Sequence, residues 1–407
     1  MMFNLSQQDA DPFSELRAFA LTLCVLLLAA LLSSCGGNRK SDLVESGEPS
    51  PLPDFVAEAR LKRQWSVGIG NGQGKYYDRL TLGFLEGEGG AEDVVVAAVN
   101  GSVGRFDARG KRVWRSAIGK RLSAGVGAND SMVLVADSDG VVHALNAENG
   151  KPLWQVDVRS EVLAAPIPER NSVLVQTGDG RLLCLAAEDG SERWVYNTDL
   201  PLLTSRGTAT PVVRNGVVYT GFATGKFVAL DLQTGSLRWD KLVALAKGQA
   251  EIERIVDIDA AALVTTNAVY VSSFNGNLFA FDRNSGSAQW RFETSSYREV
   301  AQGFGNVYLV DEDSRIHAIS ADEGELRWEQ SALLHRQLSA PAVFEGFLLV
   351  ADDQGYLHIV SQVDGAVVGR ARVDGSGVRV PMRVANDALY VYSNDGKLAA
   401  YSLQAIN

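Results

Sequence analysis

Histidine and cysteine are the residue types that could bind a metal or serve as a base or nucleophile, and the chain has four His and three Cys. His143, His317 and His358 occupy equivalent positions in three copies of a repeat. A ring of repeats would hold them far apart, so we interpret them as strand-packing residues. His335 lies in LLHRQLSAP, where no Ser or Cys motif offers it a nucleophile. These spacings predict no metal site, no catalytic residues and no cofactor.

Cys35 has the clearest chemical context. Residues 17–32, RAFALTLCVLLLAALL, place one basic residue before an apolar run that is shorter than a membrane-spanning helix needs. The run is followed by Ser33, Ser34 and Cys35, and LSSC resembles the bacterial lipobox. We therefore expect cleavage after Ser34 and lipid on Cys35, which anchors the chain permanently to a membrane. The alternative is an uncleaved anchor with a coincidental cysteine.

The leader divides the chain into three parts. We expect residues 1–34 to be a lipoprotein signal peptide and residues 35–60 to contain the lipidated Cys and a flexible polar tether. Residues 61–407 are the periodic part and form one domain. Gly36 and Gly37 follow the cysteine without an Asp next to it. Under the sorting rule for such lipoproteins, this predicts the periplasmic face of the outer membrane.

A repeated glycine and tryptophan pattern organises the periodic part. In the stretch 177–194, TGDGRLLCLAAEDGSERW, a polar turn, a short apolar strand and a second turn lead to Trp194, four residues after Gly190. The same interval precedes five further Trp residues, and Gly369 occupies the Trp position of another copy. Trp-to-Trp intervals run from 38 residues (290 to 328) to 51 residues (239 to 290), the size of a four-stranded propeller blade.

The fold predicted is all-β: an eight-bladed β-propeller of four-stranded antiparallel blades. The strand after the first turn is apolar on both faces, so neighbouring blades must cover both. The last unit has no Trp strand of its own, and Trp65 is left over near the start. We expect the N-terminal strand around residues 64–67 to close the last blade, which removes exposed sheet edges. Seven blades with irregular ends is the alternative.

Composition and charge limit the partners. The 407 residues are 46% hydrophobic, with a net charge of -11 and a pI near 5.0. A nucleic-acid surface needs clustered Lys and Arg, so we expect none. Cys184 lies on a predicted core strand and is interpreted as a small buried thiol. Aspartates in the turns, including Asp137, Asp139, Asp179 and Asp313, suit Asx turns.

Three stretches interrupt the repeat, at residues 68–79, 197–211 and 240–261. Loops that interrupt a rigid scaffold are where function concentrates. The glycines of the first stretch lack the Lys-Ser/Thr and helix of a phosphate-binding loop. The repeat itself resembles that of the quinoprotein alcohol dehydrogenases, but the chain has no vicinal Cys pair and no Cys-x-x-Cys-His. A quinone-binding or redox propeller is therefore kept as the alternative function.

The interrupting stretches carry a more specific resemblance. DLPLLTSRG at 199–207, EIERIVDID at 251–259, FNGNLFAFD at 274–282 and LLHRQLSAP at 333–341, with the lipobox and the repeats, resemble the BamB family. That family is the lipoprotein subunit of the machinery that assembles β-barrels in the outer membrane. The resemblance implies an eight-bladed propeller and a non-enzymatic scaffold that docks on the periplasmic POTRA domains of BamA. It also implies assistance to unfolded outer-membrane protein clients.

The resemblance also implies docking residues. The family's docking loop matches Leu203 and Arg206, with Ser205 where the family pattern has Leu, and its second patch matches Asp257 and Asp259. An exposed Leu and a forked guanidinium are good interface anchors. Two carboxylates spaced by two residues can face one basic partner surface. The alternative is that Leu203 packs internally and Arg206 neutralises an acid within the chain.

Overall fold

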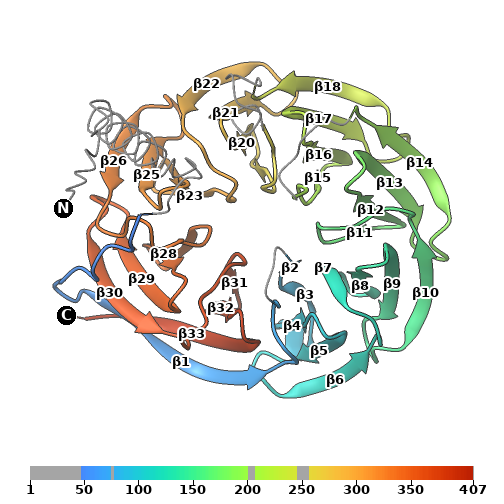
Figure 1. Ribbon diagram of the computed structural model, residues 1–407, viewed down its shortest axis with the longest axis horizontal. Coiled ribbons are helices and arrows are strands. Elements are labelled where there is room, and N and C mark those ends of the chain that lie inside the picture. Colours follow the sequence, from blue (N-terminus) through green and yellow to red (C-terminus); the bar gives the residue numbers. More distant parts are fainter. Residues whose placement is uncertain (1–46, 75–77, 200–206, 245–255, 407) are drawn as a thin grey trace, which may run out of the picture. The chain divides into compact units, whose positions relative to one another are not determined.

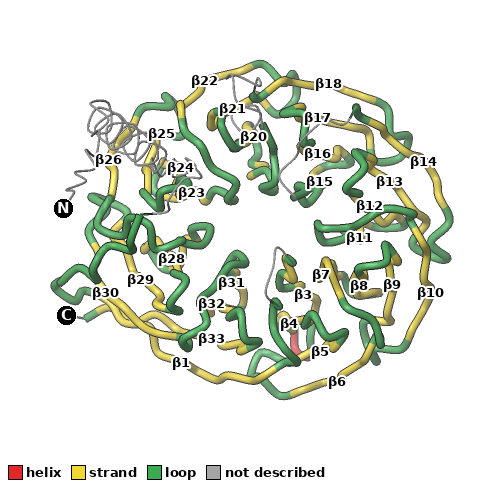
Figure 2. Tube along the Cα trace, viewed as in Figure 1, coloured by secondary structure: helices red, strands yellow, loops and turns green. Residues whose placement is uncertain are grey.

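The computed structural model describes residues 47–74, 78–199, 207–244 and 256–406, and residues 48–407 form one compact unit. The described residues are almost entirely strands and loops, and their one helical element is the 3-10 turn η1 (Glu88–Gly90) (Figure 2). Within them, no helix is long and apolar enough to cross a membrane. The expected signal peptide and the lipid attachment site Cys35 lie outside the described residues.

The strands form eight antiparallel blades arranged in a closed ring (Figure 1). This confirms the predicted eight-bladed propeller, and the seven-blade alternative was wrong. In chain order the blades are β3 (Gly83–Glu86), β4 (Glu92–Ala97), β5 (Ser102–Phe106) and β6 (Arg112–Ala117); β7 (Leu122–Ala128), β8 (Met132–Asp137), β9 (Val141–Asn146) and β10 (Pro152–Asp157); β11 (Ile167–Glu169), β12 (Ser172–Gln176), β13 (Arg181–Ala186) and β14 (Glu192–Asn197); β15 (Val212–Arg214), β16 (Val217–Gly221), β17 (Lys226–Asp231) and β18 (Leu237–Leu242); β19 (Leu263–Val264), β20 (Ala268–Ser272), β21 (Asn277–Asp282) and β22 (Ala288–Glu293); β23 (Ala301–Gly303), β24 (Asn306–Val310), β25 (Ile316–Ser320) and β26 (Leu326–Gln330); β27 (Ala342–Phe344), β28 (Phe347–Ala351), β29 (Tyr356–Ser361) and β30 (Val367–Arg372); and β31 (Arg383–Ala385), β32 (Ala388–Tyr392), β33 (Lys397–Ala405) and β1 (Ala59–Gly68).

The N-terminal strand closes the ring as predicted. In the eighth blade β1 pairs antiparallel with β33, from Ala59 opposite Ala405 to Gly68 opposite Lys397. The two ends of the domain therefore share one sheet. The second blade differs from the prediction, because the two-residue strand β2 (Arg79–Leu80) adds a fifth strand parallel to β7.

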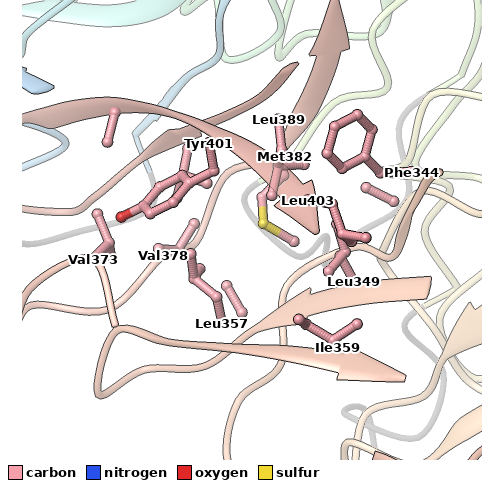
Figure 3. Close-up of a cluster of buried hydrophobic side chains, with 14 of the residues drawn as sticks. Phe344, Leu349, Leu357, Ile359, Val373, Val378, Met382, Leu389, Tyr401 and Leu403 are labelled. Carbon is pink, nitrogen blue, oxygen red and sulfur yellow. The ribbon is translucent and has the colours of Figure 1, made fainter. Parts of the chain in front are cut away.

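The core lies between blades and not within one. On β9, Leu145 packs into the apolar cluster shared with the first blade, whereas Val142 and Ala144 pack into the cluster shared with the third. Figure 3 shows the seventh and eighth blades contributing apolar side chains to a single cluster, including Phe344, Met382 and Tyr401. Both strand faces are thus buried, as the sequence pattern required.

The repeated Trp links each blade to the next. The indole Nε1 of Trp194 on β14 donates to the carbonyl of Leu232 in the following blade, 3.0 Å away. A Cβ on Gly235, in the same turn of that blade, would lie only 2.7 Å from the Trp194 ring. We call this contact the tryptophan clasp. The seven Trp and carbonyl pairs are Trp65 and Ala108, Trp114 and Ala147, Trp154 and Ala187, Trp194 and Leu232, Trp239 and Arg283, Trp290 and Ala321, and Trp328 and Gln362.

The eighth junction has no clasp. Gly369 stands at the Trp position of β30, and a Cβ there would lie 2.3 Å from the carbonyl oxygen of Ala59. Backbone bonds replace the indole: Glu58 N–H donates to Val368 (2.9 Å), and Ile406 N–H donates to Glu58 (2.7 Å). The start of the chain thus occupies the place that a Trp fills elsewhere.

Residues 48–58, which we call the N-terminal strap, are bonded to the ring, although we expected a flexible tether as far as residue 60. Ser50 N–H donates to Leu334, and Arg336 Nη1 donates to the Ser50 carbonyl at 2.8 Å. On β30, Arg370 Nη2 donates to Pro53 at 2.7 Å, and its guanidinium lies 5.0 Å from the Phe55 ring centroid. Polar composition suggested a free tether, but arginines of the ring bind its carbonyl groups.

The clasp can be tested by adding a methyl group at its glycine. Gly235 and Gly216 have φ of 70° and 76°, but a Cβ on Gly216 would meet nothing within 4 Å. Gly216→Ala should cost about 1–2 kcal/mol for the left-handed backbone alone. Gly235→Ala should cost about 1–3 kcal/mol more, because the methyl overpacks the Trp194 ring. Urea unfolding midpoints of the two variants measure the difference, and equal midpoints would show that the clasp tolerates the methyl.

The strap can be tested by limited proteolysis. Arg370→Ala removes the bond to Pro53 and the contact with Phe55, so cleavage within residues 48–58 should become faster. Arg372→Ala is the matched control, since Arg372 lies on the same strand and bonds to Gln354 and Asp374 instead. Equal cleavage rates in wild type and Arg370→Ala would contradict a role for Arg370 in holding the strap.

Candidate docking face and central cavity

The connections between successive blades all lie at one end of the strands. Each runs from the outermost strand of one blade to the innermost strand of the next, beside the turns between the second and third strands. Gly178 N–H in such a turn donates to Glu161 in the preceding connection at 2.8 Å. Conversely, His335 N–H in a connection donates to Asp313 in such a turn of the preceding blade, also at 2.8 Å. We call this end of the ring the connection face.

A cavity of about 800 Å³ lies at the connection face. Seven of the eight connections supply described residues to its wall, and only the short connection 118–121 does not. Three turns between second and third strands supply the rest, through Phe274, Asp353 and Asn394. The cavity is therefore formed by the irregular parts of the chain, which the blades hold in place.

The predicted docking residues fall in two of these connections. Leu203, Ser205 and Arg206 lie outside the described residues, and the described chain resumes at Gly207. Asp257 and Asp259 are described and are buried, with 0% and 7% of their surface exposed. We expected these two carboxylates to be exposed and to face a basic partner surface, but both are buried within this chain. Their role in docking stays a prediction.

The buried Asp259 joins the two predicted docking segments. A Cβ on Gly207 would lie 2.4 Å from Asp259 Oδ1, so the chain passes directly over this carboxylate. Ile258, between the two aspartates, points the other way and would contact a Cβ on Gly221 at 2.2 Å. The Asp257 carbonyl accepts a bond from Phe274 N–H at 2.9 Å. Residues 256–260 are thus packed into the ring, and the carboxylate of Asp259 lies against Gly207.

The equivalent histidines each bond to an aspartate six residues earlier. His143 Nε2 lies 2.8 Å from Asp137 Oδ2, and the same pairing joins His317 to Asp311 and His358 to Asp352 at 3.1 Å. The histidines are strand residues, as interpreted from the sequence, but the partner aspartates were missed. Their constant six-residue spacing could have revealed them. Within the described part of the chain no three His, Cys, Asp or Glu side chains are placed to hold a metal.

The four turn aspartates divide into two kinds. Asp137 Oδ1 accepts from the backbone N–H of Asp139 and Val141, which confirms its Asx turn. The expectation was wrong for the other three, whose recorded carboxylate bonds go to side chains and not to turn N–H groups: Asp139 to Lys120, Asp179 to Arg181 and Thr177, and Asp313 to Arg315. A long basic side chain near each turn competes successfully for the carboxylate. The turns carry ion pairs that spacing alone did not indicate.

Comparisons with known proteins identify the family. A family model described as outer membrane protein assembly factor BamB matches residues 99–330 and 312–405. The BamB protein of Pseudomonas aeruginosa is 44% identical over 381 residues, covering 93% of this chain and 98% of its own. The chain belongs to the BamB family of outer membrane protein assembly factors. This confirms the family resemblance drawn from the interrupting stretches.

Solved structures agree with this membership. The crystal structure of BamB from Moraxella catarrhalis matches with a TM-score of 0.77 at 26% identity, over 84% of this chain and all of that one. The quinohemoprotein alcohol dehydrogenase of Comamonas testosteroni matches with a TM-score of 0.63 at 13% identity, over 84% of this chain and 76% of that one. At that identity the second match shows the fold alone, and it adds nothing for a redox function.

Burial of His358 predicts a pH dependence of stability. His358 is fully buried beside Asp352, with Arg336 and Arg370 nearby, and burial lowers its pKa below the ordinary value of 6.5. Burial alone would raise the pKa of Asp352, but the bonds from His358, Tyr356 and Arg336 outweigh burial and hold it below 3.8. The Asp352 contribution to stability is therefore lost only in more acidic solution than the His358 contribution.

The free energy of unfolding should fall as the pH drops below about 6.5, because the unfolded chain then protonates His358 and the folded chain does not. His358→Gln should remove up to about 1.4 kcal/mol of that fall per pH unit. Urea unfolding of both proteins at pH 7.5 and pH 5.5 measures it. An identical fall in wild type and variant would show that His358 does not titrate on unfolding in this range.

Proposed function

We propose that this chain is a non-enzymatic scaffold lipoprotein of the outer-membrane β-barrel assembly complex, anchored by lipid on Cys35 at the periplasmic face of the outer membrane. It docks through its connection face on the POTRA domains of BamA and assists the delivery and insertion of outer-membrane proteins. Family membership supports the assembly role. The docking site is supported by one observation above all, the passage of Gly207 over the buried Asp259 carboxylate.

That contact assigns different tasks to the predicted docking residues. Leu203 and Arg206 belong to the segment that ends at Gly207 and are the ones proposed to touch the partner, with Ser205 between them. A bidentate guanidinium is a typical interface anchor, and a neighbouring Leu adds apolar contact area. Asp257 and Asp259 are buried within the chain, so their proposed task is to fix the segment above them. Preorganising a binding loop strengthens binding by reducing the ordering cost.

The rigidity of the ring supports a scaffold role. Seven clasps and the strap hold the blades, so the connections are displayed on a fixed base. The connection that ends at Pro211 and the one that ends at Ala262 enter adjacent blades, through β15 and β19. Two segments distant by some fifty positions in the chain thus form one neighbouring surface, which suits a partner that contacts both.

Co-purification of BamA from membranes with tagged variants tests the proposal. Arg206→Ala combined with Asp257→Ala should reduce recovered BamA about tenfold or more, as expected for loss of an interface anchor. Gly207→Ala should also reduce it, because its Cβ would displace the segment from Asp259 without removing a contact residue.

Gly375→Ala is the matched control for Gly207→Ala. Gly375 lies in another connection, and a Cβ there would meet only Arg372 Nη2 at 3.6 Å. Asp257→Asn separates loss of charge from loss of fold, and circular dichroism of each variant checks the fold. Wild-type recovery of BamA with the folded Arg206→Ala and Asp257→Ala double variant would refute the assigned site.

A further inference from the structure

The central cavity contains a buried cation that forms no ion pair. Arg298, in the connection 294–300, is only 7% exposed and lines the cavity. Its Nη1 donates to the Asp311 carbonyl at 2.7 Å, and its guanidinium lies 4.3 Å from the centroid of the Tyr297 ring. No carboxylate in the described part of the chain lies within salt-bridge distance of it. A guanidinium has five N–H donors, so donors remain for a further acceptor.

A second guanidinium converges on the same place. Arg79, on β2, also lines the cavity, and its one recorded bond is a long one, 3.3 Å from Nη1 to the Asp259 carbonyl. Burial lowers the pKa of Arg298, the nearby Tyr297 and Asp311 raise it, and the positive charge of Arg79 lowers it again. A buried guanidinium without an ion pair is costly, and an anion bound beside it would offset that cost.

Four carboxylates also line the cavity: Asp78, Asp259, Glu299 and Asp353. Two of these four are paired with other cations. Glu299 forms a two-pronged pair with Arg383, at 2.8 and 3.1 Å, and Asp78 pairs with Arg121. Asp311 and Glu312 attract Arg298 at longer range. Their recorded partners are different ones: His317 and Arg315 for Asp311, and Ser295 for Glu312.

The rest of the wall is mainly apolar. It includes Leu163, Ala164, Ala165, Ala260, Leu338 and Val378. A largely apolar cavity with a few placed polar groups is the usual form of a small-molecule site, and about 800 Å³ lies in the usual size range of roughly 300–1,000 Å³. The fork of an arginine matches a carboxylate or a phosphate.

We propose that this cavity binds a small organic anion, a carboxylate or phosphate carried on an apolar body, with Arg298 and Arg79 gripping the acidic group. The apolar body lies against the alanine, leucine and valine side chains of the wall. The cavity shares Asp259 with the predicted docking residues. The proposed anion contacts are made by Arg298 and Arg79, so the site stands whether or not the proposed docking is correct.

Isothermal titration calorimetry on the full folded domain tests this with three probes of similar shape: phenyl phosphate, benzoate and the uncharged benzamide. Saturable binding of phenyl phosphate or benzoate is expected, with no measurable binding of benzamide. The stronger of the two anions identifies the acidic group. Arg298→Gln and Arg79→Gln should each weaken that binding about tenfold, the usual loss for one charge-assisted hydrogen bond.

Arg315→Gln is the matched control and should leave binding unchanged, because Arg315 does not line the cavity and pairs with Asp313. Arg298→Lys keeps the charge and should retain part of the affinity. If Arg298→Gln does not fold, Arg79→Gln decides. The proposal is overturned if neither anion binds saturably, if benzamide binds as well as benzoate, or if the glutamine variants bind like wild type.

Discussion

The tryptophan clasp is the interaction on which the rest of the ring depends. Each indole places a large apolar surface against the next blade and uses its one polar atom for a carbonyl there, as at Trp194 and Leu232. The clasp therefore buries the apolar ring and also gives the indole N–H a hydrogen-bond acceptor. It works only because a glycine lies under the ring, since a methyl group at Gly235 would occupy that space. The repeated Gly and Trp are thus the two halves of a contact between blades.

This contact explains which features were predictable. Gly190 and Trp194 are four residues apart in one repeat, which indicated the repeat and its length. In space, however, Gly190 packs on Trp154 of the preceding blade, and Trp194 packs on Gly235 of the following one. The period along the chain indicates the length of each blade, but it does not indicate which neighbouring blade each residue contacts. The blade count and the closing strand followed from the pattern alone.

The cavity, in contrast, was not predictable from the sequence, because its residues do not follow the repeat. Arg79, Arg298 and Asp259 belong to connections that share no period, and they meet only because the ring brings its connections together at one end. Asp257 and Asp259 show a related limit. Alternation suggested two carboxylates on one exposed face, yet both are buried, and Gly207 passes over the carboxylate of Asp259. Burial of a loop depends on other loops, and the sequence pattern of one segment does not contain that information.

The position of the missing Trp follows from the same contact. A clasp needs, in the next blade, a turn between the third and fourth strands that supplies the carbonyl and the glycine. In the eighth blade those strands are β33 and β1, from opposite ends of the domain, so no such turn exists there. A Trp at position 369 would have had no partner. Glycine there instead admits the backbone of Ala59, and Glu58 bonds to both Val368 and Ile406. The eighth clasp is therefore absent because the N-terminal strand closes the ring. At this junction the strap holds the two blades together instead of a Trp.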